Sequence, residues 1–300
     1  MVHAHETEEH SIENSLTVSF LLNLTSSVVE IVGGLLSGSL SLISDALHNL
    51  SDSIALLLSL IAVKLSKKEN TETKTFGYKR AEILAALFNA CMLIIVSLYL
   101  FKEAFIRFFH PQQINSLLML FVAFVGLLAN LISVFLLKGH THSDMNVRSA
   151  YIHLFSDFLS SIAVIAGALA IYVFKSYWID PVLTFIIGIY VLFGGYKVLE
   201  ESLGILMQNV PKDISLKEIQ NKIEAFAGVK NLHHAHLWAV TENDVHFEAH
   251  INLTEDIPVS ETCKMYGYIE KMLEETFSIY HTTLQFEVDS CTGTTLIKKK

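Results

Sequence analysis

The sequence predicts an α-helical membrane protein with six transmembrane helices, followed by a cytoplasmic α+β domain. The chain of 300 residues is 52% hydrophobic and only 17% charged, and its mean hydropathy is +0.46. This composition is too apolar for an ordinary soluble domain. Long apolar segments fill the first two thirds of the chain, whereas the last third has the amphipathic and alternating patterns of a small soluble domain.

Six apolar segments are long enough to cross a bilayer, which takes about 20 helical residues for about 30 Å. The predicted spans are residues 15–36, 39–63, 82–106, 114–137, 148–174 and 181–202, within a membrane domain of residues 15–208. Residues 1–14 form an acidic tail that carries histidines and contains no Lys or Arg. Because a signal peptide needs a basic start, we interpret the first span as retained.

Basic residues predict the orientation of the spans. No Lys or Arg precedes Lys64, whereas the segment that joins spans two and three holds Lys64, Lys67, Lys68, Lys74, Lys79 and Arg80. The positive-inside rule places this loop in the cytoplasm, so six spans put both termini there as well. We expect a multi-pass protein of the cell (plasma or inner) membrane. The net charge of -9 gives no reason to expect a nucleic-acid partner.

The pattern changes after "NVPKD" at 209–213. "SLKEIQNKIEAF" has the periodicity of an amphipathic helix, "LHHAHLWAV" and "VHFEAHINL" alternate like strands, residues 260–277 are helical in pattern, and "TTLQFEV" alternates again. This order predicts a small α+β sheet with its helices on one face over residues 209–290, followed by a tail at 291–300. A domain of this size has a thin core, which favours dimerisation.

Ionisable residues lie inside the second predicted span, in "SDALHNLSD". Asp45, His48 and Asp52 are costly at bilayer depth, where such residues usually serve a substrate or ion path. His48 and Asp52 are four residues apart and therefore share a helix face. The fifth span repeats this spacing in "HLFSD", with His153 and Asp157.

Together the two pairs provide two imidazole nitrogens and two carboxylates, a ligand set that suits tetrahedral Zn²⁺. Two carboxylates also balance a divalent charge, which matters in a low dielectric. One such pair alone also fits a polar contact between helices, but identical spacing on two apolar spans favours a joint metal site. Asp45 has two interpretations, as a carboxylate that orients His48 or as a gate. Other polar residues of the spans either line a hydrated path or pack between helices: Asn23, Glu30, Asn89 and Asn130.

Several segments together resemble the cation diffusion facilitator family of metal/proton antiporters. They are "DALHNLSD", "HLFSD", "FGYKRAEILAALFNA", "NVRSAYIH", "DPVLTFIIG", "HLWAV" and "TLQFE", and the resemblance extends over residues 15–290. It implies six transmembrane helices, a ferredoxin-like cytoplasmic domain and a homodimer. It also implies that the protein is not an enzyme but exports divalent metal from the cytoplasm against protons by alternating access, without an organic cofactor. The His-Asp pair of the second span resembles members that prefer Zn²⁺, while Cd²⁺, Co²⁺ and Fe²⁺ stay open as cargo.

The resemblance also implies a regulatory metal site in the tail. His236, His250 and Glu287 match positions that bind metal in some relatives, with His234 and His281 as further partners. Pairing of the strands would let these side chains converge. The alternative is a polar sheet edge without metal. If a Zn²⁺ ion does bind, we expect it to bridge or tighten the two protomers.

Two other function classes fit the buried ligands less well. An intramembrane metallohydrolase needs an open coordination position and a general base, and the chain contains no His-Glu-x-x-His sequence. A passive channel needs sites that release ions quickly, whereas four protein ligands hold a cation tightly.

Overall fold

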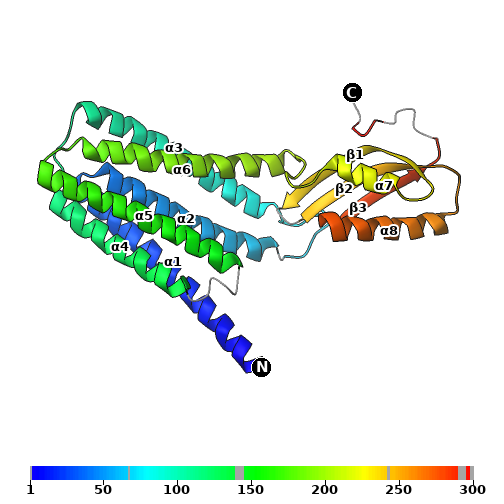
Figure 1. The fold of residues 1–300 in the computed structure, drawn as a ribbon, viewed down its shortest axis with the longest axis horizontal. Coiled ribbons are helices and arrows are strands. Elements are labelled where there is room, and N and C mark those ends of the chain that lie inside the picture. The colour runs from blue at the N-terminus through cyan, green and yellow to red at the C-terminus, as the bar shows by residue number, and fades with distance from the viewer. Residues whose placement is uncertain (1, 67, 139–144, 242–243, 290–294, 298–300) are drawn as a thin grey trace. The chain divides into compact units, whose positions relative to one another are not determined.

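The computed structural model describes residues 2–66, 68–138, 145–241, 244–289 and 295–297. The chain forms two compact units: Met1–Ile61 with Ala85–Leu199, and Ala62–Leu84 with Glu200–Lys300. The first unit is helical, and the second contains the sheet (Figure 1).

A long helix covers each of the six predicted spans. They are α1 (Val2–Ser37), α2 (Leu40–Ser66), α3 (Ala81–Phe109), α4 (Ser116–Lys138), α5 (Met145–Phe174) and α6 (Ile179–Leu206). Five segments of the described chain are long and apolar enough to cross a membrane: Thr17–Ser37, Ala81–Phe109, Ser116–Lys138, Tyr151–Phe174 and Ile179–Leu206. Helix α2 is not among them, and its apolar run is interrupted by Asp45, His48, Asn49 and Asp52.

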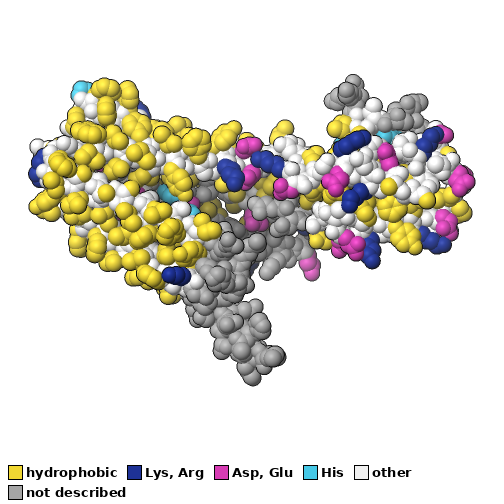
Figure 2. Space-filling model, in the orientation of Figure 1, with side chains coloured by type: hydrophobic (Ala, Val, Ile, Leu, Met, Phe, Trp, Pro, Cys, Tyr) yellow, Lys and Arg dark blue, Asp and Glu magenta, His cyan; other side chains and the backbone are white. Residues whose placement is uncertain are grey.

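The surface of the helical unit is apolar, as a lipid-facing surface must be. Large side chains point outward along the helices, including Leu35, Phe121 and Phe193, which are 68%, 67% and 70% exposed. Figure 2 shows hydrophobic side chains spread over the visible face of these helices, whereas Lys, Arg, Asp and Glu are frequent on the sheet-bearing part. Exposed apolar surface of this extent indicates a membrane environment.

The turn between α1 and α2 is tied to the start of α6. Gly38 turns the chain with a φ of 77°, a conformation that glycine adopts without strain. Asp180, which is fully buried, accepts hydrogen bonds from Ser39 Oγ at 2.7 Å, Leu40 N at 2.8 Å and Ser41 N at 3.1 Å. A carboxylate from α6 therefore caps the amino end of α2. This cap fixes the end of the helix that carries His48 and Asp52.

The interior of the helical unit is closely packed. Leu42, Met119, Val164 and Ile187 belong to one buried cluster that joins α2, α4, α5 and α6. Helices α1 and α4 approach at Gly33, where a Cβ atom would come within 2.5 Å of Val122 Cγ2. Close approach of this kind through small residues is common between membrane helices.

The second unit has the element order that the sequence predicts. It contains α7 (Leu216–Glu224), β1 (Val229–Thr241), β2 (Asp244–Leu253), α8 (Val259–Phe277) and β3 (His281–Glu287). The strands form one sheet in the order β1-β2-β3, with β1 antiparallel and β3 parallel to β2. The parallel pair requires the crossover that α8 provides.

Both helices of this unit cover the same face of the sheet. Ile219 of α7, Ile269 of α8 and alternate β2 residues such as Phe247 and Ile251 form one buried cluster. Because side chains alternate along a strand, the residues between them in β2 lie on the opposite face. These are His246, Glu248, His250 and Asn252.

Strand β1 is irregular where its histidines lie. The register with β2 shifts between His233 and His236, and His234 has a φ of 49°. The backbone N–H groups of His234 and Ala235 donate to the carbonyls of Thr295 and Leu296, at 3.3 and 2.8 Å. These two carbonyls thus accept hydrogen bonds from backbone N–H groups of β1 that, because of the bulge, do not pair with β2.

The basic loop between α2 and α3 belongs to the same compact unit as the sheet. Lys79 Nζ lies 2.7 Å from Asp244 Oδ2, and the ring of Phe76 contacts His246 with centroids 5.5 Å apart. Ala62–Leu84 therefore form one compact unit with the sheet, although they precede α4 in the part of the chain that contains the predicted spans.

Candidate metal sites

Helices α2 and α5 bring the four predicted ligands of the membrane domain together. His153 Nε2 lies 3.2 Å from Asp52 Oδ2 and 3.7 Å from Asp157 Oδ2. His48 presents Nδ1 to Asp52 at 3.4 Å and Nε2 to Asp157 at 3.9 Å. Each helix contributes a His and an Asp one turn apart, so the i, i+4 spacing of the sequence places both pairs on facing surfaces.

The separations suit a single small cation. In a tetrahedral zinc site with bonds of about 2.1 Å, neighbouring ligand atoms are about 3.4 Å apart, close to the His-Asp distances given above. One ligand atom from each of His48, Asp52 and Asp157 lies within 4.8 Å of the others. His153 contacts both carboxylates but lies outside this group of three.

These ligand atoms are buried and lack hydrogen-bonding partners among the described residues. This holds for both ring nitrogens of His48, for Asp52 Oδ2 and for both carboxylate oxygens of Asp157. Buried polar groups normally have a partner, because leaving one unsatisfied costs about 1–3 kcal/mol. A bound cation would satisfy one ring nitrogen of His48 together with carboxylate oxygens of Asp52 and Asp157.

Two neighbours of the site were not identified from the sequence. Ser160 Oγ donates to Asp45 Oδ1 at 2.5 Å, so Asp45 is held by α5, and no hydrogen bond joins it to His48 in the described residues. The ring of Tyr190 on α6 packs edge-on against His48, with centroids 5.9 Å apart. Ser160 is four residues from Ser156 in a serine-containing stretch, and Tyr190 has no sequence signal that points to the site.

A second cluster lies on the helix-free face of the sheet. Ring nitrogens of His233, His234 and His250 lie within 4.8 Å of one another. Glu287 faces this cluster, with Oε1 3.0 Å from His233 Nε2 and Oε2 3.3 Å from His250 Nδ1. Three imidazoles and one carboxylate form another ligand set suited to Zn²⁺.

The cluster includes three of the five residues predicted in the tail, together with His233, which the sequence analysis did not select. His236 is exposed and lies opposite Glu248 in the β1-β2 register. His281 lies at the other end of β3 from Glu287, against His246 with ring centroids 4.2 Å apart. The structure thus brings neither His236 nor His281 to the cluster. The only sequence signal for His233 is its position beside His234.

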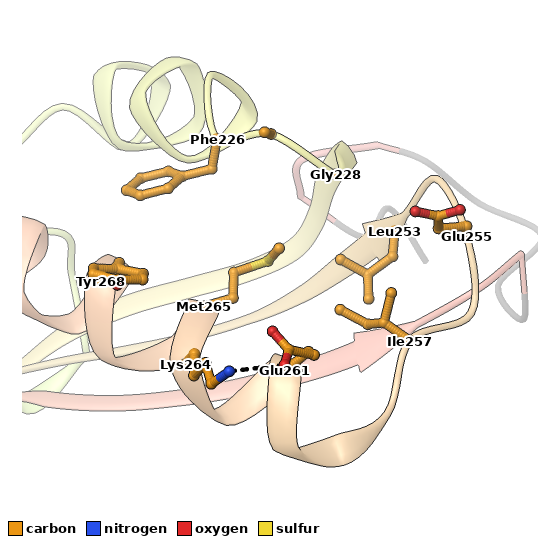
Figure 3. Close-up of a pocket in the computed structure, with 10 residues that line it drawn as sticks. Phe226, Gly228, Leu253, Glu255, Ile257, Glu261, Lys264, Met265 and Tyr268 are labelled. Carbon is orange, nitrogen blue, oxygen red and sulfur yellow. Dashed lines mark hydrogen bonds and ion pairs between the residues drawn. The ribbon is translucent and has the colours of Figure 1, made fainter.

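A groove on the helix-covered side of this unit is chemically different (Figure 3). Its volume is about 620 Å³, and Phe226, Leu253, Met265 and Tyr268 are among its lining side chains. The Lys264 and Glu261 side chains beside it pair with each other at 2.8 Å. None of its lining residues is a histidine or cysteine, so the groove does not contribute to either metal cluster.

A ligand set for a divalent cation, buried between helices of a membrane domain, is typical of proteins that move ions across membranes. Comparison with known proteins identifies the family. Residues 16–207 match the cation efflux transmembrane domain, and residues 211–289 match the cytoplasmic domain of cation efflux proteins. The chain belongs to the cation diffusion facilitator family. It is a multi-pass membrane protein with a cytoplasmic domain, and its class is that of divalent metal cation efflux transporters, not enzymes.

Similar proteins cover nearly the whole chain. The metal cation efflux system protein CzcD of Cupriavidus metallidurans is 39% identical over 279 residues, which is 93% of this chain and 88% of the relative. The cadmium, cobalt and zinc/H(+)-K(+) antiporter of Bacillus subtilis is 38% identical over 288 residues, 95% and 92% of the two chains. Zinc transporter ZitB of Escherichia coli is 34% identical over 300 residues, 98% and 95% of the two chains.

Proposed function

We propose that this protein exports Zn²⁺ from the cytoplasm in exchange for protons, with His48, Asp52, His153 and Asp157 as the transport site. The observation that carries the proposal is the convergence of two His-Asp pairs from facing helices, with His-Asp separations of 3.2 to 3.9 Å. The relatives named as zinc transporters and as a cadmium, cobalt and zinc/H(+)-K(+) antiporter support the same cargo and exchange. Cd²⁺, Co²⁺ and Fe²⁺ are alternative cargoes of a nitrogen-oxygen site.

Charge neutrality provides the coupling. Two carboxylates and two neutral imidazoles balance one Zn²⁺, and protons can balance the same carboxylates after the cation leaves. An imidazole that binds metal cannot hold a proton on the same nitrogen, so binding and protonation exclude each other. Alternating access then loads metal from the cytoplasm, where few protons compete, and protons displace it on the other side.

We infer a topology of six crossings with both termini in the cytoplasm. Helix α2 is long enough to cross, and its polar residues face the transport site. The basic loop that follows α2 packs with the cytoplasmic sheet through Lys79, which supports the predicted side for that loop. We propose an inner or plasma membrane location, a homodimer assembled through a ferredoxin-like domain, and domain limits of 15–208 and 209–290. Two observations support the dimer. The matched cytoplasmic domain of cation efflux proteins is a dimerisation domain by name, and a sheet domain of this size has a thin core.

The transport site is tested with Asp157→Ala in proteoliposomes. Removing one carboxylate leaves a divalent ion with uncompensated charge in a low dielectric, so zinc flux should fall at least about 100-fold. Glu103→Gln is the matched control, because it also removes a carboxylate from a membrane helix but lies in an ion pair with Arg107 at 2.9 Å. Zinc flux of Asp157→Ala close to that of the control would exclude the assignment.

Proton coupling is tested by measuring zinc flux with and without an imposed pH gradient. Antiport predicts faster efflux when the receiving side is acidic. A flux indifferent to the gradient would rule out proton exchange while leaving the metal site intact.

We further propose that the cluster of His233, His234, His250 and Glu287 binds a regulatory Zn²⁺. The buried ion pair between His233 and Glu287 at 3.0 Å places a carboxylate beside three imidazoles, which supports a cation there. His236 and His281 remain candidates only if a partner protomer reaches them. Zinc titration in the Asp157→Ala background isolates this site: His233→Ala should abolish the remaining binding, whereas His236→Ala should retain it. Equal binding by both variants would contradict the proposal.

A further inference from the structure

Glu30 of α1 is a buried carboxylate that the transport site does not use. Its side chain is 1% exposed, and Oε2 has no hydrogen-bonding partner among the described residues. Oε1 occupies space beside α4 that only a glycine leaves free: a Cβ atom on Gly126 would lie 1.5 Å from it. The packing of α1 against α4 therefore holds this carboxylate in a fixed place inside the helical unit.

The surroundings of Glu30 are polar and acidic. Asn49 of α2 is fully buried, and its side-chain amide lies beside the Glu30 carboxylate. The charged groups that act on Glu30 are Asp45 of α2 and Asp157 of α5, both acidic, while α4 contributes Gly126. No cation among the described residues offsets these charges at Glu30.

A carboxylate in this setting requires a cation. Burying an unpaired negative charge is expensive, and two nearby carboxylates raise the expense. A proton needs one carboxylate oxygen, whereas a metal ion needs a shell of several ligands. No hydrogen bond or ion pair links Glu30 to His48, Asp52, His153 or Asp157 in the described part of the chain.

We propose that Glu30 carries a counter-proton at a position separate from the metal ligands. This inference rests on the proton exchange proposed above and assigns part of it to a particular side chain. With the transport site empty, a proton on Glu30 removes the cost of a buried carboxylate whose Oε2 has no hydrogen-bonding partner among the described residues. When Zn²⁺ binds, its positive charge acts on Glu30 through the same low dielectric, and the carboxyl group releases its proton as the metal enters. Each Zn²⁺ bound thus displaces a proton from Glu30 without a shared ligand.

The principal test is Glu30→Gln in the full-length protein. Zinc titration in buffers of different ionisation enthalpy counts the protons released as each Zn²⁺ binds. We expect the variant to bind Zn²⁺ but to release about one proton fewer per ion than the wild type. In proteoliposomes, its zinc flux should respond less to a pH gradient. Unchanged proton release would overturn the proposal, and so would loss of zinc binding comparable with Asp157→Ala, because Glu30 would then belong to the metal site.

A second variant is designed to displace the Glu30 carboxylate by a substitution on α4. Gly126→Ala introduces a methyl group where Oε1 lies, so it should displace Glu30 and reduce proton release in the same way. Gly194→Ala is the matched control, since no atom lies within 4 Å of the Cβ that it would add. Proton release by Gly126→Ala equal to that of Gly194→Ala would contradict the proposal even if Glu30→Gln failed to fold.

Flux measurements on the wild-type protein distinguish failure of the antiport proposal from failure of the Glu30 proposal. If wild-type flux ignores the pH gradient, the proposed antiport fails. If wild-type flux responds to the gradient and Glu30→Gln responds equally, antiport stands and the role of Glu30 is refuted.

Discussion

His48 is the proposed ligand whose chemical type should decide which cation the proposed transport site prefers. Replacing it with Asp exchanges a borderline nitrogen for a hard oxygen and adds a negative charge. We predict that His48→Asp binds Zn²⁺ less tightly relative to Mn²⁺ and Cd²⁺, with a change of about tenfold in the preference ratio. A competition assay with the three ions measures it. An unchanged order of preference would show that His48 is not a ligand.

His246 makes the stability of the cytoplasmic domain depend on pH. Burial lowers the pKa of His246, with His281 and Lys79 acting in the same direction and Asp244 opposing them. The folded state therefore binds this proton less readily than the unfolded state does. The stability that neutral His246 contributes is complete above a pH of about 6.5, the pKa of histidine in the unfolded chain. It is lost as the pH falls below that value.

We accordingly predict that the unfolding temperature of the purified protein falls between pH 7 and pH 5, and that His246→Gln flattens this dependence. Thermal unfolding at several pH values measures it. His236→Gln is the control, because that side chain is exposed on the neighbouring strand. Identical pH profiles for His246→Gln and the wild type would refute the role of His246.

The pairing of His and Asp within each helix could be predicted residue by residue because its geometry is local. The spacing of four fixes the shared helix face of His48 and Asp52, and of His153 and Asp157, whatever surrounds the helices. The partner of Asp45 could not be predicted in this way. Ser160 lies 115 positions away in the chain, and its contact depends on how α2 and α5 pack.

At the scale of elements, the start of α2 depends on a carboxylate from another helix. Asp180 accepts four hydrogen bonds, from the backbone of Leu40 and Ser41 and from the hydroxyls of Ser39 and Ser41. We predict that Asp180→Ala lowers stability by about 2–4 kcal/mol, because it leaves buried donors at a helix end unsatisfied. Thermal unfolding in detergent measures the loss.

Asp256→Ala is the control for this prediction, since Asp256 is exposed and outside any helix. Equal stability of the two variants would show that the capping of α2 by Asp180 is dispensable.

The bulge in β1 explains why the sequence pattern did not indicate that His233 lies in the sheet cluster. Strict alternation places His234 and His236 on one face and His233 on the other. The register shift between His233 and His236, with His234 at a φ of 49°, breaks that alternation and brings two consecutive histidines beside His250. Bulges depend on pairing with other segments, here including Thr295 and Leu296, so a single strand pattern does not reveal them.

At the scale of the whole molecule, the order of the elements was predictable, but the membership of one loop was not. Apolar length and alternation identify the six long helices and the α-β-β-α-β order of the tail. The segment Ala62–Leu84, which includes the end of α2 and the start of α3, is far in sequence from the sheet with which it forms a compact unit. Its charges predicted only the side of the membrane, because the pairing of Lys79 with Asp244 is a tertiary contact.

We predict that this ion pair couples the loop to the cytoplasmic domain. Lys79→Asp and Asp244→Lys should each lower the stability of the purified protein by about 0.5–1 kcal/mol, the range for partly exposed pairs. The double variant restores opposite charges and should recover most of the loss. A double-mutant cycle at low and high salt measures the coupling, and additive losses in the double variant would show that the two residues do not interact.

The four proposed transport ligands differ strongly in exposure. Side-chain exposure is 42% at His153, 27% at Asp52, 12% at His48 and 1% at Asp157. In the proposed site, a cation that enters from the exposed side would meet His153 before Asp157. These two side chains lie one turn apart on α5, so we expect substitution of His153 to change how fast an ion is captured and substitution of Asp157 to change how long it stays.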